Sequence, residues 1–438
     1  MSKTNINNII DETESRAILI GLITPENSES ECERSLDELE RLADTAGISS
    51  CAKLVQSRMS PDAATYIGKG KIEEAKGVIA ANDINIAIVD DELSPSQIRN
   101  LEDCFGELNI EVIDRTMLIL EIFSMRAYSS EGKLQVEIAL LRYTMPRLTG
   151  KGKEMSRLGG GAGGGAGARR GAGETKLEVE RRNLKSRISS LENELKHLEV
   201  SREVMRARRE KSGIPNIAIA GYTNSGKSTL LNYLTDSGIF AEDKLFATLD
   251  PTTRKLNTPS GTEILLTDTV GFIKKLPHHL IQAFKSTLNE INYSDIILLV
   301  ADISDSEHEE QLEVAKSLLY DMGITDKPII IAYNKIDRIS TDIITDRENA
   351  VISSEDIVYI SAATGEGIDS LLIKIEEVLS RQKSSVNFIF PLDEQSPINN
   401  LYKNSKVLDI EYRDDSVAVK AVVDNKTKGM YEKYLIGV

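Results

Sequence analysis

One stretch of eight residues constrains the fold of this chain more than any other: Gly221-Tyr222-Thr223-Asn224-Ser225-Gly226-Lys227-Ser228. It lies between an apolar strand-like run, residues 216–220, and an apolar helix-like run. A glycine-rich loop in this setting curls its backbone N–H groups around phosphates at the start of a helix. We expect Lys227 to offset charge on the two terminal phosphates and Ser228 to offer its hydroxyl to Mg²⁺. The stretch therefore predicts an α/β domain that binds a nucleotide.

Three further motifs follow predicted strands in the same part of the chain. After residues 263–267 comes Asp268-Thr269-Val270-Gly271, whose carboxylate can hold the hydration shell of Mg²⁺ and whose Gly271 amide can hydrogen-bond a γ-phosphate. The other two motifs follow residues 328–333 and 357–360, and they are Asn334-Lys335-Ile336-Asp337 and Ser361-Ala362-Ala363.

The Asp337 carboxylate is expected to select the base. It can accept hydrogen bonds from the ring N–H and the exocyclic amine of guanine, whereas adenine offers no such pair of donors at that edge. All four motifs occur in this order, each at the end of a predicted strand. The sequence therefore predicts a GTP site.

An alternation of strand-like and helix-like runs predicts a second α/β domain near the start of the chain. Its strand-like runs are residues 17–23, 51–55, 84–89 and 110–113. Its helix-like runs are residues 31–46, 71–82 and 94–105. Strands that alternate with helices in this way are typical of a parallel sheet covered by helices.

The end of the chain reads as a small α+β domain. It combines a strand at residues 386–390, a hairpin of residues 407–412 and 417–423, and a closing helix at residues 428–435. We therefore expect four domains: an N-terminal α/β domain at residues 1–127, a helical hairpin at 128–212, a P-loop nucleotide domain at 213–384 and the α+β domain at 385–438.

Two apolar seams flank a glycine-rich stretch in the middle of the chain. One seam runs from Leu134 to Leu148 and the other from Leu177 to Met205, both with coiled-coil spacing. Between them, residues 159–173 contain nine glycines. The capping box Thr175-x-x-Glu178 predicts that the second helix starts there, so that residues 174–211 would span roughly 57 Å. We expect an antiparallel hairpin in a monomer; the alternative, a dimeric coiled coil, is disfavoured by the effective concentration of the linked seams.

Positive charge is concentrated in this hairpin. The whole chain has a net charge of −16, yet residues 128–212 hold 19 Lys and Arg against 11 Asp and Glu. Arg169 and Arg170 lie inside the glycine-rich stretch. A glycine backbone can approach RNA closely and guanidinium groups add charge and stacking, so we expect RNA contact there. A passive linker is the alternative.

Other classes of protein fit the sequence less well. No apolar run approaches the roughly 20 residues that a membrane-spanning helix needs, and residues 1–14 are polar and acidic, unlike a signal peptide. The three cysteines are far apart and form no Cys-x-x-Cys motif, which disfavours a disulfide framework or a thiolate metal site. We therefore expect a cytoplasmic protein.

The motifs of residues 214–383 resemble, in their order, the G domain of translation-factor-type GTPases. In that family a threonine in the loop after the first helix completes the coordination of Mg²⁺, and residues 246–254 offer three candidates between which spacing does not choose. The loop begins Phe246-Ala247-Thr248-Leu249-Asp250, a run that resembles that of HflX GTPases. This resemblance implies that Thr248 is the ligand.

The resemblance to the HflX family covers most of the chain. It is carried by residues 61–71, 90–97, 112–116 and 131–137 and by the glycine-rich stretch, with Ala172 as a departure where relatives commonly have proline. It implies a GTPase that binds the 50S subunit, with 23S rRNA and the peptidyl-transferase centre near the hairpin. Related proteins separate stalled 70S ribosomes into subunits under stress. The alternative is a nucleotide-gated large-subunit binding or assembly factor without splitting activity.

Phe272 occupies the position where many GTPases place a glutamine that orients the attacking water. A phenyl ring has no polar group for that task. We therefore expect slow unassisted turnover of GTP, with another group, from a rearranged loop or from the ribosome, ordering the water.

Overall fold

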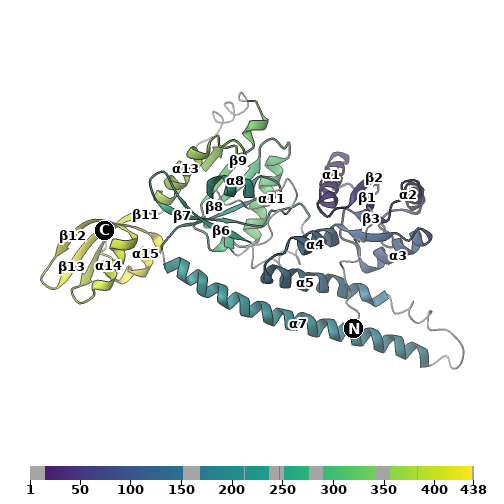
Figure 1. Cartoon of the computed structure of the whole chain (residues 1–438), viewed down its shortest axis with the longest axis horizontal. Helices are drawn as coiled ribbons and strands as arrows, with labels where there is room; N and C mark the ends of the chain where they lie inside the picture. The colour runs from purple at the N-terminus through teal and green to yellow at the C-terminus, as the bar shows by residue number, and fades with distance from the viewer. Residues whose placement is uncertain are drawn as a thin grey trace. The chain divides into compact units, whose positions relative to one another are not determined.

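The computed structural model describes residues 15–150, 168–211, 213–235, 246, 251–275, 290–340, 356–381 and 383–436. The chain, coloured by residue number in Figure 1, divides into two compact units. Unit 1 comprises residues 1–200, 242–250 and 270–288, and unit 2 comprises residues 201–241, 251–269 and 289–438. Two segments of the predicted nucleotide domain thus group with the N-terminal unit. The expected domain boundaries at 127, 212 and 384 stay predictions.

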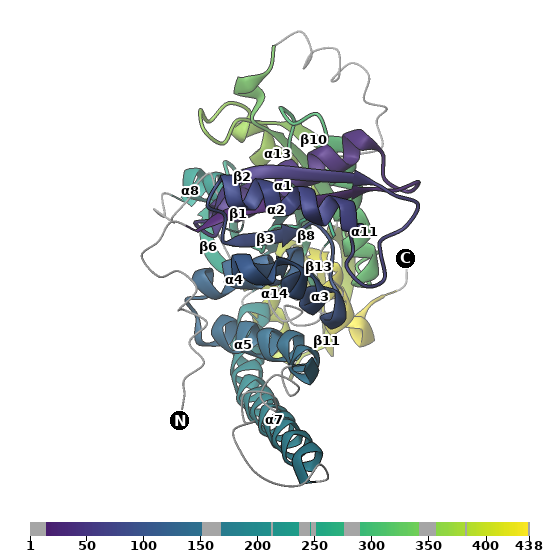
Figure 2. The ribbon, with the colours of Figure 1, turned by 90° about the vertical axis from the view of Figure 1, so that its right-hand side faces the viewer.

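Unit 1 contains a four-stranded parallel sheet in the order β2-β1-β3-β4. Its strands are β1 (Arg16–Ile23), β2 (Ser49–Ser57), β3 (Ile86–Val89) and β4 (Glu111–Asp114). The helices between them are α1 (Glu29–Thr45), α2 (Lys69–Ala81) and α3 (Pro95–Phe105), as Figure 2 shows. Ser28 and Ser94 start α1 and α3 with capping boxes. The expected parallel α/β domain is confirmed.

The helix α4 (Arg115–Arg126) follows β4 directly and was not expected from the sequence. Asp114 caps it, because its side chain accepts a hydrogen bond from the Met117 N–H at 2.9 Å. The helix buries apolar residues on several sides, among them Leu118, Leu120 and Phe123. Such all-round burial leaves no amphipathic period by which the sequence could reveal a helix.

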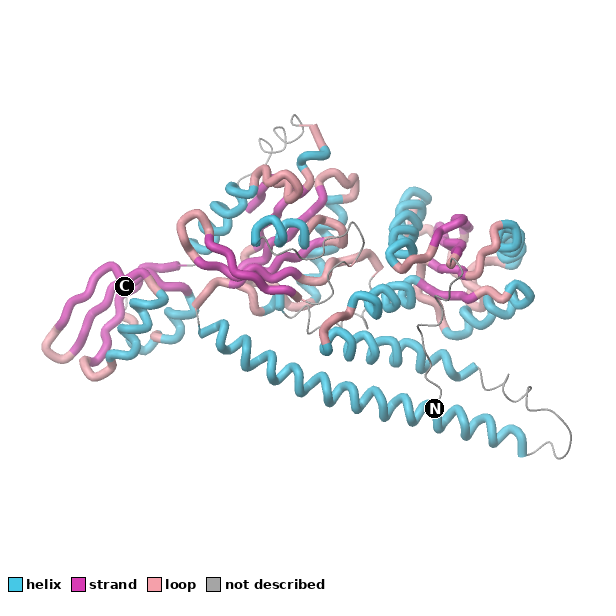
Figure 3. Tube along the Cα trace, in the orientation of Figure 1, coloured by secondary structure: helices cyan, strands magenta, loops and turns pink. Residues whose placement is uncertain are grey.

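The predicted hairpin consists of α5 (Ser130–Thr144), a 3₁₀ turn (Met145–Gly150) and α7 (Ala168–Lys211), and Figure 3 shows both long helices in cyan. The two apolar seams pack together, through Leu134 and Ile138 of α5 against Ile188 and Leu191 of α7. The expected start of the second helix at the capping box is wrong. α7 begins at Ala168 and has 44 residues, so it is about 66 Å long.

Unit 2 contains a six-stranded sheet in the order β10-β9-β8-β5-β7-β6. The strands are β5 (Asn216–Gly221), β6 (Thr252–Asn257), β7 (Glu263–Asp268), β8 (Ile296–Asp302), β9 (Ile329–Asn334) and β10 (Asp356–Tyr359). All pairs are parallel except β6 with β7. The helices include α8 (Lys227–Thr235), α11 (His308–Asp321) and α13 (Ile368–Arg381), and α8 and α13 share one apolar core with the strands.

A three-stranded antiparallel sheet, β11-β13-β12, closes the chain. It comprises β11 (Lys383–Pro391), β12 (Lys406–Tyr412) and β13 (Ser416–Asp424), with Phe388 and Phe390 fully buried against α14 (Gln395–Asn404) and Tyr431. Two short pieces, α15 (Asn425–Met430) and a 3₁₀ turn (Glu432–Tyr434), replace the single helix expected at residues 428–435. Within the described part of the chain, no helix is long and apolar enough to cross a membrane.

Packing of the hairpin predicts the effect of one substitution. Leu191 is 1% exposed between α7 and α5, so Leu191→Ala should lower the free energy of local unfolding by about 2–5 kcal/mol. Val179 lies on the same helix but is 52% exposed, so Val179→Ala should change it by less than about 0.5 kcal/mol. Hydrogen exchange of the α5 amides measures both, and equal exchange in the two variants would contradict this packing.

Candidate nucleotide-binding site

The four predicted motifs lie at one edge of the six-stranded sheet. They follow the carboxyl ends of β5, β7, β9 and β10, which neighbour one another or the central strand β8 in the sheet. Parallel strands place their carboxyl ends on the same edge, where open α/β sheets bind their ligands. The sheet therefore brings together residues that are more than a hundred positions apart in the sequence.

Two glycines of the P-loop, residues 221–228, are required because atoms of neighbouring strands lie very close to them. Gly221 has φ of +146°, and a Cβ atom there would lie 2.2 Å from the Val300 carbonyl oxygen. Gly226 has φ of +91°, and its Cβ would lie 2.2 Å from the Asn334 side-chain nitrogen. A side chain at either position would push the loop away from the neighbouring strands, so only glycine permits this tight turn.

Lys227 is buried at the start of α8, and its ammonium group donates a hydrogen bond to the Tyr222 carbonyl oxygen at 2.7 Å. Burial lowers its pKa to about 8, against the opposing pull of the Asp268 carboxylate and with a small contribution from Lys335. A neutral carbonyl is a weak partner for a cation. The charge of Lys227 is therefore available to an incoming phosphate, which can replace the carbonyl.

Ser228 and Asp268 provide oxygen atoms beside the P-loop. The Ser228 hydroxyl donates to a carboxylate oxygen of Asp268 at 2.8 Å, and Asp268 is fully buried. Thr269, the next residue, fixes the end of β7 by donating to the Ile219 carbonyl oxygen at 2.7 Å. Hydroxyl and carboxylate oxygens are ligands that Mg²⁺ prefers, so the residues present fit that ion.

Two further hydroxyls of the P-loop also fit a phosphate ligand. Thr223 and Ser225 are buried, and their side-chain oxygens have no hydrogen-bond partner among the residues that the structure describes. Buried hydroxyls without partners are costly, and phosphate oxygens could accept their hydrogen bonds. Both residues belong to the predicted phosphate-binding stretch, and the fold adds that their hydroxyls are buried.

Asn334 joins the P-loop to the base-selecting motifs. Its side-chain N–H donates to the Ser225 carbonyl oxygen at 2.8 Å, and its side-chain oxygen accepts from the Ala362 N–H at 2.9 Å. Ser361 in turn donates to the Asp337 carboxylate at 2.6 Å, which orients that carboxylate. Three motifs are thus connected by hydrogen bonds into one arrangement.

Lys335 depends on a residue that sequence reasoning missed. It adopts a left-handed backbone conformation with φ of +67°, and its ammonium group lies 2.7 Å from the carboxylate of Asp302. Asp302 ends β8, so it lies at the same sheet edge as the four motifs. Its position after the most apolar strand of the domain is the signal that could have found it.

The other predicted site residues are only partly described. Phe246 is buried, but Ala247, Thr248, Leu249 and Asp250 lie outside the described residues. Val270 and Phe272 on either side of Gly271 are buried, as is Ile336, whereas Ala363 is exposed. Arg169 and Arg170 lie in the first turn of α7, so they belong to a helix and not to the expected loop.

Several basic residues of the hairpin are engaged within unit 1. Arg142 pairs with Glu192 at 2.6 Å, and Arg187 pairs with Glu137 at 2.8 Å, both across the hairpin. Arg147 lies 3.0 Å from the carboxylate of Asp114 and stacks over the ring of Tyr143. Part of the positive charge counted in the sequence therefore holds the hairpin together and fixes it to the N-terminal sheet.

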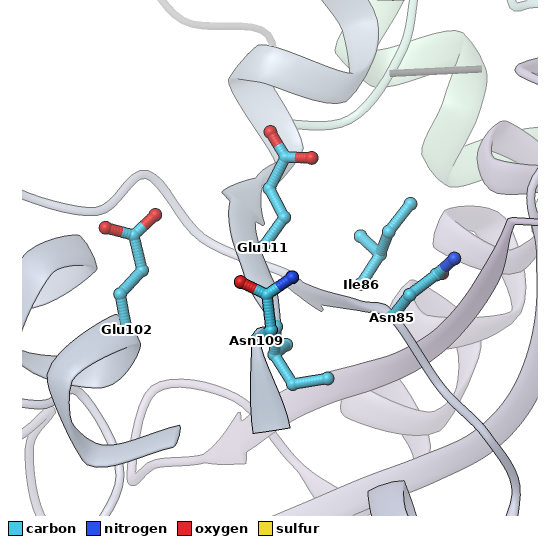
Figure 4. Close-up of a pocket in the computed structure, with 6 residues that line it drawn as sticks. Asn85, Ile86, Glu102, Asn109 and Glu111 are labelled. Atoms are coloured by element: carbon cyan, nitrogen blue, oxygen red, sulfur yellow. The ribbon is translucent and has the colours of Figure 1, made fainter. Parts of the chain in front are cut away.

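A separate cavity of about 290 Å³ opens at the amino-terminal edge of the N-terminal sheet (Figure 4). Its lining residues are Asn85, Ile86, Glu102, Asn109, Ile110 and Glu111. Two carboxylates and no basic side chain line it, which suits a phosphate poorly. This cavity is distinct from the nucleotide motifs.

The lowered pKa of Lys227 predicts proton uptake on nucleotide binding. Above a pH of about 8 the free protein holds Lys227 neutral, and the phosphates favour its charged form, so GTP binding should take up a proton and weaken as the pH rises further. Calorimetry in buffers of different ionisation enthalpy measures the uptake. Lys227→Met, which keeps the volume but cannot titrate, should lack it; equal uptake in both proteins would refute the assignment.

Family models match nearly the whole chain. Residues 33–124 match the model for the GTP-binding GTPase N-terminal domain, residues 126–209 the GTP-binding GTPase middle region, residues 216–335 the 50S ribosome-binding GTPase, and residues 347–434 the HflX C-terminal domain. The second and third of these models begin close to α5 and to β5, whereas the last begins at residue 347, well before β11.

Individual relatives agree with these models. The GTPase HflX of Lacrimispora saccharolytica is 49% identical over 95% of this chain and 95% of its own length. That of Caldanaerobacter subterraneus subsp. tengcongensis is 46% identical over 96% of this chain and 94% of its own length. A crystal structure of a GTP-binding protein from Sulfolobus solfataricus in complex with GDP is 26% identical, with a TM-score of 0.43, over 84% of this chain and 99% of that one. The two HflX relatives and the family models show that the chain belongs to the HflX family of GTPases.

Proposed function

We propose that this GTPase binds the 50S ribosomal subunit and, in its GTP state, separates stalled 70S ribosomes into subunits under stress. One observation carries the proposal. The Asn334 network gathers the GTP motifs at one sheet edge, within residues that match a family described as a 50S ribosome-binding GTPase. Hydrolysis of GTP to GDP and phosphate then releases the protein. Such a role places the protein in the cytoplasm, where ribosomes are.

The P-loop and the strand ends hold the nucleotide in this proposal. The loop amides and Lys227 bind the phosphates, Gly271 contacts the γ-phosphate, and Asp337 accepts hydrogen bonds from guanine. Asn334 and the segment Ser361-Ala362-Ala363 position the base-binding carboxylate. Ser228 and Thr248 would hold Mg²⁺, which neutralises charge on the β- and γ-phosphates when bound.

Because of Phe272, GTP hydrolysis needs another group to orient the attacking water. It follows Gly271 and is 2% exposed, so neither its chemistry nor its placement lets it orient a water molecule. Another group has to order the attacking water, and we assign it to the ribosome-bound state. Turnover of GTP is therefore slow for the free protein and rises when the 50S subunit is present.

The hairpin is the proposed RNA-binding element. Its helices are held together by an apolar seam and by ion pairs, so it can carry the glycine-rich stretch as a rigid arm. Arg169 and Arg170 at the start of α7 are the expected contacts to 23S rRNA near the peptidyl-transferase centre. Because the seams pair within one chain, the protein acts as a monomer.

A binding or assembly factor without splitting activity is the second candidate. The ion pairs across the hairpin favour it, because Glu192 and Glu137 offset part of the charge that Arg142 and Arg187 could offer to RNA. In that case the nucleotide state would control attachment to the 50S subunit and nothing more. The two candidates differ in whether 70S ribosomes come apart.

Light scattering of 70S ribosomes tests the proposed splitting. With this protein and a non-hydrolysable GTP analogue, scattering should fall, and replacing Arg169 and Arg170 by alanine should slow the fall by about tenfold or more, while GTP turnover without ribosomes stays unchanged. Replacing the exposed Lys406 and Arg413 is the charge-matched control and should have no effect. Unchanged scattering with the intact protein, alongside intact 50S binding, would favour the second candidate.

Substitution of Asp337 tests the proposed base recognition. Asp337→Asn removes a charged acceptor and should weaken GTP binding by about tenfold or more relative to ATP. Xanthosine triphosphate has a carbonyl in place of the exocyclic amine, and the new amide N–H can donate to it, so binding of this nucleotide should improve. Competition binding measures all three nucleotides, and an undiminished preference for GTP over ATP would show that Asp337 does not read the base.

A further inference from the structure

An acidic pair at the carboxyl edge of the N-terminal sheet holds a lysine from the segment after Gly271. Asp90 and Asp91 follow β3 directly. The Lys275 ammonium group lies 2.8 Å from the carboxylate of Asp90 and 3.0 Å from that of Asp91, and it also donates to the Asp90 carbonyl oxygen at 3.2 Å. All three residues belong to unit 1, although Lys275 lies more than 180 positions later in the chain.

A buried ionic cluster stands behind this contact. Asp90 is 2% exposed, and its carboxylate also accepts from Arg115 at 2.7 Å and from the Ser35 hydroxyl at 2.6 Å. Arg115 pairs in addition with Glu38 and donates to the Lys274 carbonyl oxygen at 3.3 Å. The cluster therefore binds the segment after Gly271 at two points, the Lys274 carbonyl oxygen and the Lys275 side chain.

The charges explain why the cluster needs Lys275. Three carboxylates, of Glu38, Asp90 and Asp91, face the two cations of Arg115 and Lys275. Loss of Lys275 would leave a buried excess of negative charge, which is costly. Burial lowers the pKa of Lys275, but the two aspartates outweigh this and raise it, so the lysine stays charged.

The backbone at Lys275 is held in an uncommon conformation. Its φ is +55°, in the left-handed region that a residue other than glycine rarely adopts. Surrounding contacts have to maintain such a conformation, and here the ionic cluster does so. The conformation of this segment is thus set from the N-terminal sheet.

Few residues separate Lys275 from Gly271, the residue expected to contact the γ-phosphate. Four peptide units join Gly271 to Lys275, so at most about 14 Å separate their Cα atoms. Between them, Phe272 and Ile273 are 2% and 1% exposed, so packing restricts the movement of this segment. A shift of Gly271 toward a γ-phosphate would therefore reach Lys275.

A second contact, between aromatic rings, joins the segment before Thr248 to the N-terminal unit. The rings of Phe246 and Phe123 pack edge to face, with 4.7 Å between their centres, and Phe123 lies on α4 of the N-terminal unit. Aromatic pairs in this geometry are favourable beyond their buried area. The segment before the expected Mg²⁺ ligand Thr248 and the segment after Gly271 therefore both contact N-terminal elements.

We propose that Lys275 is a positioning residue for GTP hydrolysis, and that Asp90 and Asp91 are the site through which the N-terminal unit senses the nucleotide. This inference rests on the proposed contact of Gly271 with the γ-phosphate. GTP and GDP then stabilise the contact to Lys275 differently. By linkage, a ligand of the N-terminal unit changes the preference for GTP over GDP by the same factor.

A double-mutant cycle tests the coupling in the full-length protein. The variants are Lys275→Ala, Asp91→Asn and their combination, with Lys275→Arg as the conservative replacement. Asp91 is chosen because its side chain is 41% exposed and its loss should not prevent folding. Lys255→Ala is the matched control, since Lys255 forms a comparable 2.7 Å pair with Glu263 on β6 and β7.

Each protein is examined by calorimetry with GDP and a non-hydrolysable GTP analogue, by GTP turnover, and by hydrogen exchange of residues 86–93. We expect the exchange of this peptide to differ between the two nucleotides in the intact protein, in Lys275→Arg and in Lys255→Ala, and not in the other variants. Lys275→Ala and Asp91→Asn should each change kcat by about fivefold or more with KM nearly unchanged, and the double variant should change it no further.

The outcomes separate this inference from the function on which it rests. Nucleotide binding without a difference in exchange, or additive effects on kcat, would overturn the coupling alone. An absence of nucleotide binding by the intact protein would overturn the nucleotide site, and the coupling with it.

Discussion

The nucleotide site depends on the buried side chain of Asn334. This amide is 2% exposed, and it donates to a carbonyl oxygen of the P-loop while it accepts from the backbone of the Ser361-Ala362-Ala363 segment. Hydrogen bonds in such a buried place are strong, and an unpaired amide there would be costly. The phosphate end and the base end of the site are therefore held at a fixed separation by one residue. The same asparagine also requires glycine at position 226, because a Cβ atom there would lie 2.2 Å from its side-chain nitrogen.

Sequence reasoning located the motifs well, because each depends on local chemistry. The P-loop, Asp268, Asn334 and Asp337 all follow apolar strands that the structure confirms. What it missed depends on distant partners. Asp302 acquires its role only when β8 lies beside β9, and the polar strand β6 exists only because it pairs with β7. Local pattern alone cannot supply such pairings.

The start of α7 also shows that a local sequence signal does not suffice to place an element. The capping box at Thr175 is a good local signal, yet the helix continues back to Ala168 through four glycine or arginine positions. In the hairpin, the count of basic residues likewise overstated the positive charge available to a ligand. Each of Arg142, Arg147 and Arg187 has an acidic partner. Composition gives the charge of a segment, whereas only contacts give the charge that a ligand can meet.

Two lysines in this protein show how environment separates a ligand-binding cation from a structural one. Lys227 is buried and Lys275 is partly exposed, and in both cases desolvation acts to lower the pKa. Lys227 donates to a neutral carbonyl oxygen and its pKa stays low, so an arriving phosphate improves its surroundings. Lys275 lies between two carboxylates that raise its pKa, so any anion would have to displace partners of equal charge. The first lysine is thus suited to bind phosphate and the second to hold a segment of the protein, although the sequence shows both simply as lysines that follow a glycine-containing turn.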